Sequence, residues 1–197
     1  MPAKVRRCPI KWETIQVAIP LKQKRDHIMS DSSKPAVLLA PLEGLPPLLS
    51  PDIHTIILGS FPSRESLAAS QYYAHPRNQF WRLLSEVLDD DLAQLPYEDR
   101  LPHLLAHKIG LWDVISMCER EGSLDARIKH AVANDFDLLK KECPNLRKVC
   151  FNGKVAGAYA ERLASAGFDV IVLPSSSPAY ASRSFEDKLG IWKKIVD

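Results

Sequence analysis

Two short stretches of this chain gather the residue types that can grip a flat ring and do chemistry at its edge. The first begins with the apolar run IILGSF at residues 56–61, which is typical of a buried strand that breaks into a loop. The loop leads to Tyr73 and then to Asn78, at the head of an amphipathic segment. Open α/β sheets bind ligands where their parallel strands end. Aromatic faces, a carboxamide and free backbone N–H groups at that edge indicate a site for a flat heterocycle.

The second stretch, LPSSSPAYA at residues 173–181, follows the last apolar run of the chain. Hydroxyl groups and backbone amides in such a loop can bind phosphate oxygens. Pro178, Ala179 and Tyr180 could also form an apolar wedge, although an ordinary Ser/Pro loop has the same composition. Between the two stretches lies FNGK at residues 151–154, where Asn152 ends another apolar run.

These stretches resemble the motifs of the uracil-DNA glycosylase superfamily, most closely those of its hypoxanthine-DNA glycosylase (deoxyinosine glycosylase) family and its mismatch-specific branch. The resemblance covers roughly residues 50–197 and rests on GSFPS, YYAHPRNQFW, FNGK and LPSSSPAYA. It implies an α/β fold of three layers, α/β/α, with a short, mainly parallel central sheet of about four strands. It also implies a monofunctional DNA glycosylase of base excision repair that removes a deaminated base, with hypoxanthine the first choice and uracil the second.

Asn78 is the catalytic residue that the resemblance implies. The superfamily usually places its attacking water with an Asp or Asn two residues after the glycine of the first motif. Here that position holds Phe61, which cannot orient water. The hypoxanthine-specific family also lacks the usual residue and has an asparagine in the second segment. The Asn78 amide can both accept and donate hydrogen bonds. Its alternative role is to cap the helix that follows.

Other residues of the motifs have both a substrate-binding and a structural interpretation. Tyr73 matches the aromatic residue that stacks on the extruded base, but it could be a packed core tyrosine. Asn152 could read a base edge or occupy a turn before Gly153. Asp113 could support water or repel a wrong base, unless it forms a salt bridge or caps a helix. His75 is expected to be structural or to face a phosphate. The expected substrate-binding residues are Gly59, Ser60, Phe61, Tyr73, Asn152, Ser175, Ser176, Ser177, Pro178 and Tyr180.

The composition is that of an ordinary single globular domain. The chain has 197 residues, of which 46% are hydrophobic and 25% charged. The spacing of the four cysteines contains no CxxC pair and argues against the iron–sulfur cluster that some relatives carry. We expect no metal site on the histidines. We therefore expect no metal and no cofactor, reduced thiols, an intracellular location and no membrane partner. The resemblance implies DNA as the partner, and we expect a monomer.

Charge and loop signals divide the chain into three parts. Residues 1–28 hold seven Lys and Arg against two acids, a net charge of +5, so the remainder carries −3. We interpret this part as a basic extension, either non-native or loosely held, that could anchor DNA. Residues 29–50 are a loop-rich segment that leads into the core, and residues 51–197 are the catalytic domain. Because that domain is not basic overall, DNA contacts must come from a local patch.

Apolar periodicity predicts alternating strands and helices over the domain. Strands are expected at Ile53–Leu58, Ile109–Val114, Lys148–Phe151 and Phe168–Leu173. Helices are expected at Arg77–Leu88, at Tyr97–His107 with Pro102 interrupting or starting it, at Leu124–Glu142, at Val155–Ala166, and at Ser184–Val196 with Ser184 as its N-cap. This alternation favours a parallel sheet covered on both faces. The segment Glu119–Glu121 is expected to be a solvated surface.

Three other interpretations of the function remain. Phe61 in the water-placing position makes a nucleic-acid-binding module, with the same fold but altered chemistry, a serious alternative. A G:U/G:T mismatch-specific uracil-DNA glycosylase is another. An unrelated α/β hydrolase is disfavoured because the chain has no GxSxG motif. Neither of the two main motifs contains a lysine placed as a Schiff-base nucleophile, so strand cleavage is not expected.

Overall fold

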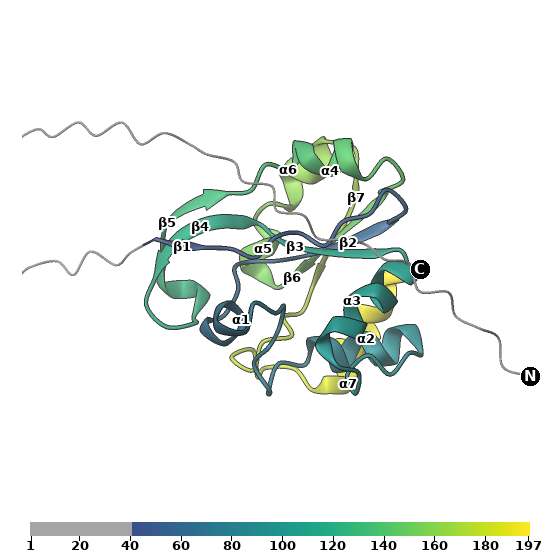
Figure 1. Cartoon of the computed structure of the whole chain (residues 1–197), viewed down its shortest axis with the longest axis horizontal. Helices are drawn as coiled ribbons and strands as arrows, with labels where there is room; N and C mark the ends of the chain where they lie inside the picture. The colour runs from purple at the N-terminus through teal and green to yellow at the C-terminus, as the bar shows by residue number, and fades with distance from the viewer. Residues whose placement is uncertain (1–40) are drawn as a thin grey trace, which may run out of the picture. The chain divides into compact units, whose positions relative to one another are not determined.

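The computed structural model describes residues 41–197, and its centre is a parallel sheet of four strands in the order β3-β2-β6-β7 (Figure 1). These strands are β2 (Thr55–Gly59), β3 (Ile109–Asp113), β6 (Lys148–Asn152) and β7 (Asp169–Leu173). The register pairs Gly59 with Asp113 and Asn152 with Leu173, so the carboxyl ends of the strands meet at one edge. The predicted basic extension at residues 1–28 lies outside the described residues, as do residues 29–40.

Side chains that alternate along the strands pack into two apolar layers, one on each face of the sheet. On β2, Ile56 and Leu58 pack into one buried cluster and Ile57 into the other. The first cluster is covered by α4 (Asp137–Glu142), α5 (Lys154–Gly157) and α6 (Ala160–Ser165). The second is covered by α2 (Phe80–Leu88), α3 (Tyr97–Ala106) and α7 (Phe185–Trp192), which lie together on the opposite side of the sheet in Figure 1. The predicted three-layer α/β/α fold is confirmed.

Most of the expected elements exist, with their ends displaced by a few residues. Pro102 lies inside α3 rather than at a boundary. The helix expected at Val155–Ala166 is divided into α5 and α6, next to Gly157, whose backbone approaches Val172 so closely that a Cβ would lie 2.8 Å from Cγ1. Ser184 caps α7 as expected, because its Oγ accepts a hydrogen bond from the Asp187 N–H at 3.0 Å. Helix α1 (Arg64–Ala69) was not expected.

The helix predicted at Leu124–Glu142 is wrong over most of its length. A 3-10 turn (Asp125–Arg127) leads into strand β5 (Ile128–Ala133), and only α4 is helical. β5 pairs with β4 (Ile115–Arg120), which also pairs with β1 (Leu42–Glu43), and the three make a second, antiparallel sheet. The side chains of β5 are largely exposed, so no alternating apolar signal marks it, and pairing with β4 decides its conformation.

The prediction that Glu119–Glu121 is solvated fails at its central residue. Arg120 is only 5% exposed. Its guanidinium donates hydrogen bonds to the carbonyl oxygens of Gly122 and Pro62, and so ties the hairpin to the loop after β2. None of the helices in residues 41–197 combines the length and the apolar character needed to cross a membrane.

Gly110→Ala should destabilise the domain, whereas Gly190→Ala should stabilise it slightly. A Cβ at residue 110 would lie 2.8 Å from the backbone oxygen of Leu48 and 2.7 Å from Ile53 Cδ1. Overpacking of this kind costs about 1–3 kcal/mol. Gly190 lies inside α7 with open space around a Cβ, where alanine gains roughly 0.5–1 kcal/mol. Urea unfolding of both variants measures the two effects. A Gly110→Ala variant as stable as the parent would contradict the packing of Leu48 on β3.

Candidate active site

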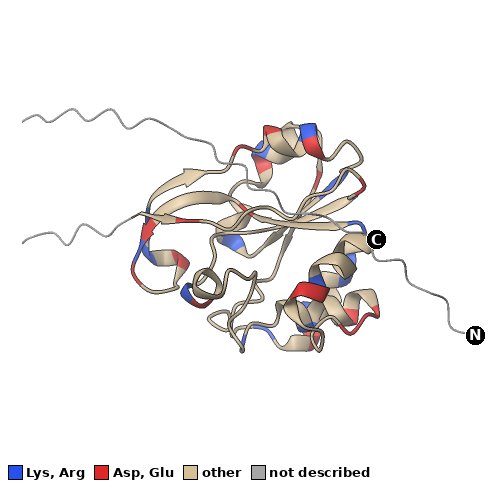
Figure 2. Ribbon diagram, in the orientation of Figure 1, with Lys and Arg blue, Asp and Glu red and all other residues tan. Residues whose placement is uncertain are grey.

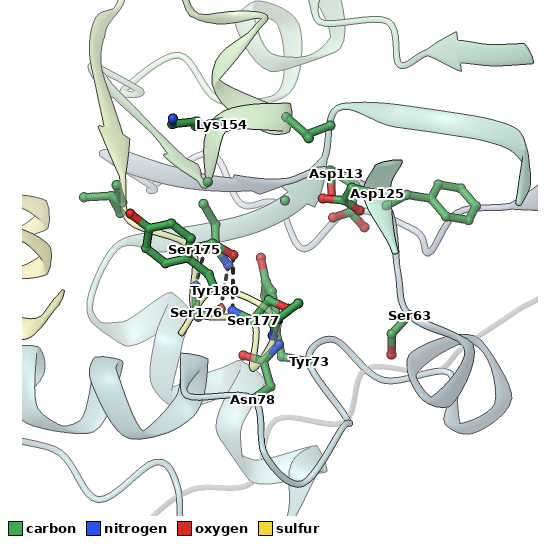
Figure 3. Close-up of a pocket in the computed structure, with 18 of the residues that line it drawn as sticks. Ser63, Tyr73, Asn78, Asp113, Asp125, Lys154, Ser175, Ser176, Ser177 and Tyr180 are labelled. Atoms are coloured by element: carbon green, nitrogen blue, oxygen red, sulfur yellow. Dashed lines mark hydrogen bonds between the residues drawn. The ribbon is translucent and has the colours of Figure 1, made fainter. Parts of the chain in front are cut away.

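A cavity of about 700 Å³ opens at the carboxyl edge of the parallel sheet (Figure 3). The last residue of every strand in that sheet lines it, namely Gly59, Asp113, Asn152 and Leu173. Most of the remaining wall comes from the loops after β2 and β7, the residues 153–155 that follow β6, the segment 72–78 and the hairpin turn before β5. Pockets of about 300–1,000 Å³ typically enclose a small organic ligand. The cavity therefore lies where the sequence predicts a site, and it has a suitable size.

Most of the expected site residues line this cavity, and two do not. Those in the wall are Gly59, Ser60, Phe61, Tyr73, Asn78, Asp113, Asn152, Ser175, Ser176, Ser177 and Tyr180. Pro178 instead lies exposed on a turn that is closed by a hydrogen bond from the Tyr180 N–H to the Ser177 oxygen at 3.0 Å. His75 lines a separate groove, and its Nδ1 accepts a hydrogen bond from the Arg77 N–H at 3.1 Å.

Two polar side chains converge on Gly59. A Cβ at this residue would lie 2.3 Å from Asp113 Oδ1 and 2.9 Å from the Tyr73 hydroxyl, so only glycine fits. The Tyr73 hydroxyl and Asp113 Oδ2 are both buried and have no hydrogen-bond partner within the described part of the chain. Unpartnered buried polar atoms are rare in folded proteins. These two therefore mark the place where a ligand or water would complete the site.

Burial raises the pKa of the Asp113 carboxyl to about 7. The nearby carboxyl of Asp125 acts in the same direction, and Arg120 opposes both. Asp125 accepts a hydrogen bond from Ser60 Oγ at 2.7 Å, and burial raises its pKa as well in spite of that bond. Across residues 41–197, Asp113 forms no ion pair and caps no helix, so neither structural interpretation holds within this part of the chain.

Asn78 precedes helix α2, whose N-cap residue is Gln79. The Asn78 Oδ1 accepts a hydrogen bond from the N–H of Phe80, the first residue of α2, at 3.0 Å, so Asn78 supports the start of this helix without being its N-cap. The Asn78 side chain makes no other hydrogen bond to the described residues. One lone pair of Oδ1 and both N–H groups of Nδ2 are therefore left for a ligand or a water molecule in the cavity. The catalytic role stays a prediction.

The Tyr73 ring is covered on one face. It stacks on Phe80 with ring centroids 3.6 Å apart and an interplanar angle of 13°, so only the opposite face could take a base. Burial, and then the Asp113 carboxyl, raise the pKa of the Tyr73 hydroxyl, which therefore stays protonated. Phe61 is 6% exposed, and the Arg120 guanidinium carbon lies 5.0 Å from its ring centroid. Phe61 thus forms an apolar part of the cavity wall, and a cation–π contact with Arg120 stabilises its ring.

Buried polar contacts fix the loops around the cavity. The Asn152 amide donates to Ser176 Oγ at 2.8 Å and accepts from the Ser176 N–H at 2.9 Å, which leaves one N–H and one lone pair for a ligand. Lys188 of α7 is 2% exposed and donates to Gln79 Oε1 at 2.8 Å and to the Tyr180 oxygen at 2.9 Å. These bonds hold the start of α2 and the loop after β7 against each other.

Three charged residues of the wall are not among the site residues predicted from the sequence: Asp125, Lys154 and Arg183. Asp125 fell within the wrongly predicted helix, although the turn signals Gly122 and Ser123 before it could have revealed the hairpin. Lys154 belongs to the FNGK motif, in which only Asn152 is a predicted site residue. Hydrogen bonding by Ser182 and Arg183, and then the charges of Arg183 and Lys154, lower the pKa of the Tyr180 hydroxyl. Residues 41–197 contain no group of three or more His, Cys, Asp or Glu that could hold a metal ion.

Comparisons with known proteins identify the family. The model of the uracil DNA glycosylase superfamily matches residues 46–196. The chain belongs to the uracil-DNA glycosylase superfamily. A hypoxanthine DNA glycosylase from Methanosarcina barkeri is 42% identical over 150 residues, which cover 76% of this chain and 94% of the relative. A second hypoxanthine DNA glycosylase, from Methanosarcina acetivorans, is 45% identical over 136 residues, or 69% of this chain and 86% of the relative.

A solved structure in this superfamily has the same fold. The solution NMR structure of a candidate uracil DNA glycosylase from Methanosarcina acetivorans superimposes with a TM-score of 0.72 at 40% sequence identity. The match covers 80% of this chain and 97% of that protein. The resemblance found in the sequence motifs is thus confirmed over nearly the whole described domain.

Asp113→Asn should make the domain more stable than the unaltered protein, and the difference in the free energy of unfolding should grow as the pH rises. Folding raises the pKa of this carboxyl from 3.8 to about 7, so between these values the folded protein keeps a proton that the unfolded chain has released. The unaltered protein therefore loses stability as the pH rises from about 4 to about 7, by at most about 4 kcal/mol, and the variant does not. Urea unfolding at about pH 5 and about pH 8 measures the difference. A variant less stable than the parent at the higher pH would show that Asp113 is ionised and held by donors.

Proposed function

We propose that this protein is a monofunctional DNA glycosylase that hydrolyses the bond between hypoxanthine and deoxyribose in base excision repair. The observation that carries the proposal is the 42% identity to a hypoxanthine DNA glycosylase over 94% of that protein's length. The cavity supports it, because about 700 Å³ admits a purine nucleoside and the wall offers aromatic, amide and hydroxyl groups. No cofactor is needed, since hydrolysis of this bond requires only water.

The reaction begins when the damaged nucleotide leaves the base stack and enters the cavity. The uncovered face of Tyr73 would stack on the base, a contact worth roughly 1–3 kcal/mol. Asn152 would read the edge of the base with its remaining N–H and lone pair. Asn78 would hold the attacking water against the anomeric carbon. Because the transition state resembles an oxocarbenium ion, the sugar itself attracts the nucleophile, and an amide that orients water is sufficient.

DNA binding would come from a local patch at the mouth of the cavity. Lys154 and Arg183 supply charge, and the Ser175–Ser177 loop supplies hydroxyl and amide donors for phosphate oxygens. The exposed turn at Pro178 and Ala179 would supply the apolar wedge that fills the vacated stack. Figure 2 shows Lys and Arg interspersed with Asp and Glu over the helices, rather than gathered on one basic face. We further propose a monomer, because residues of one chain line the cavity. We also propose that it acts inside the cell, because its substrate would be the cell's DNA.

Base release from oligonucleotides tests the proposal. Duplexes and single strands carrying hypoxanthine, uracil, xanthine or thymine are incubated with the protein, and abasic sites are revealed by alkaline cleavage. We expect hypoxanthine to be released fastest, with undiminished rate in EDTA and without strand cleavage by the protein itself. Binding without release of any base would favour the nucleic-acid-binding module. Faster release of uracil from G:U pairs would favour a mismatch-specific uracil-DNA glycosylase.

Asn78→Ala should lower the single-turnover rate of base release at least about a hundredfold, or about 2.7 kcal/mol in the barrier. The variant loses both the group that orients water and the hydrogen bond to the first N–H of α2. Asn78→Asp is the matched control, because aspartate can accept the Phe80 N–H equally well and can still orient water. Melting temperatures of both variants separate the loss of the hydrogen bond to α2 from the loss of chemistry. A near-normal rate in Asn78→Ala would place catalysis on another residue.

A further inference from the structure

The reaction proposed above gives no role to two carboxyl groups that line the cavity. Within residues 41–197, Asp113 and Asp125 are the only acidic residues that line the cavity, and they lie next to each other in Figure 3. Asp125 is held by Ser60 at 2.7 Å. No described group donates a hydrogen bond to the Asp113 side chain, whose Oδ1 lies against Gly59 and whose Oδ2 is buried without a partner. The most deeply buried acid of the wall is thus the one left free for a ligand.

The charged and titratable groups around Asp113 decide its protonation. Asp125 from the hairpin turn disfavours the carboxylate. Tyr72 and Tyr73, which face it from the segment before α2, are held neutral by burial, which raises the pKa of both hydroxyls. Arg120 of β4 favours the carboxylate, but its guanidinium is directed to the carbonyl oxygens of Gly122 and Pro62. Burial and Asp125 outweigh Arg120, so Asp113, with its pKa of about 7, carries its proton up to neutral pH.

We propose that Asp113 is the general acid of the reaction and gives its proton to the departing purine. The inference rests on the proposed function. As the bond between C1′ and N9 breaks, its electron pair passes into the purine ring, and the Asp113 proton binds an acceptor nitrogen of that ring, N7 or N3. The water oxygen binds C1′, and a water proton returns to the Asp113 carboxylate, directly or through solvent. The products are neutral hypoxanthine and an abasic sugar with a hydroxyl at C1′.

The geometry favours an acid over a base. A general base must be ionised before water attacks, and burial next to Asp125 opposes ionisation. A neutral carboxyl buried in an apolar site is instead a hydrogen-bond donor. Purines present acceptor nitrogens in both of their rings, and protonating one of them removes the cost of expelling an anion. Phe61 leaves the first motif without a carboxylate, so Asp113 is also the acid nearest to the strand end from which the family's usual residue acts.

The pH dependence of the chemical step tests the role. Single-turnover rates of hypoxanthine release are measured with the full chain between about pH 5.5 and about pH 9. We expect the rate to fall about tenfold per pH unit above about pH 7, because only the protonated acid reacts. Asp113→Asn should be slower by about a hundredfold or more at low pH and should lose this dependence, since its amide donates a hydrogen bond but no proton.

Asp125→Asn provides the second variant. Asparagine can still accept the Ser60 hydroxyl, but it removes the carboxyl that helps to raise the pKa of Asp113. The fall in rate should therefore begin at lower pH in this variant. A rate that rises through neutral pH would make Asp113 a general base, and an unchanged profile in Asp113→Asn would remove it from the chemistry. Either result would leave the proposed function intact, whereas failure of the unaltered protein to release hypoxanthine at any pH would overturn the proposed function itself.

Discussion

The contact between Asp113 and Gly59, at the ends of two paired parallel strands, is the constraint on which the site depends. The register that pairs these residues puts a carboxyl group over a backbone without a side chain. The Tyr73 hydroxyl also lies in the space that a side chain at residue 59 would fill. Two buried polar groups without hydrogen-bond partners, the Tyr73 hydroxyl and the Asp113 carboxyl, therefore both lie beside Gly59. Their burial raises the pKa of both groups and keeps both protonated. A larger residue at position 59 would separate them and fill the floor of the cavity.

The position of the site could be predicted from the sequence, because the signals for it are local. An apolar run that ends in Gly59, and another that ends in Asn152, mark strand ends, and parallel strands bring their ends together. The roles of the side chains were harder to predict. Asn78 was expected either to cap the helix or to act on substrate. The structure shows one hydrogen bond between Asn78 and the start of α2, and it leaves both N–H groups of the amide free for a ligand.

The hairpin could not be predicted in the same way. β5 is mostly exposed and carries no apolar alternation, and its conformation depends on pairing with β4, whose register it follows with irregularities. Because the hairpin was not predicted, neither were the two residues that it brings to the site. These are Asp125 in the cavity wall and Arg120, which packs on the Phe61 ring. In the sequence, Phe61 is simply a loss of the family's polar residue. In the structure it is an apolar wall, and the carboxyl groups reach the cavity from the neighbouring strand and the hairpin.

The ionisation of Asp113 links the fold to the proposed chemistry, and it can be measured without substrate. Carbon-13 NMR of the aspartate carboxyl groups, assigned by comparison with Asp113→Asn, follows the pKa of this residue directly. A midpoint near 7 is predicted, because burial and Asp125 outweigh Arg120. A midpoint near 3.8, the ordinary value for an aspartate, would show that the carboxylate is stabilised in the folded protein and would contradict the role of a proton donor at this edge of the sheet.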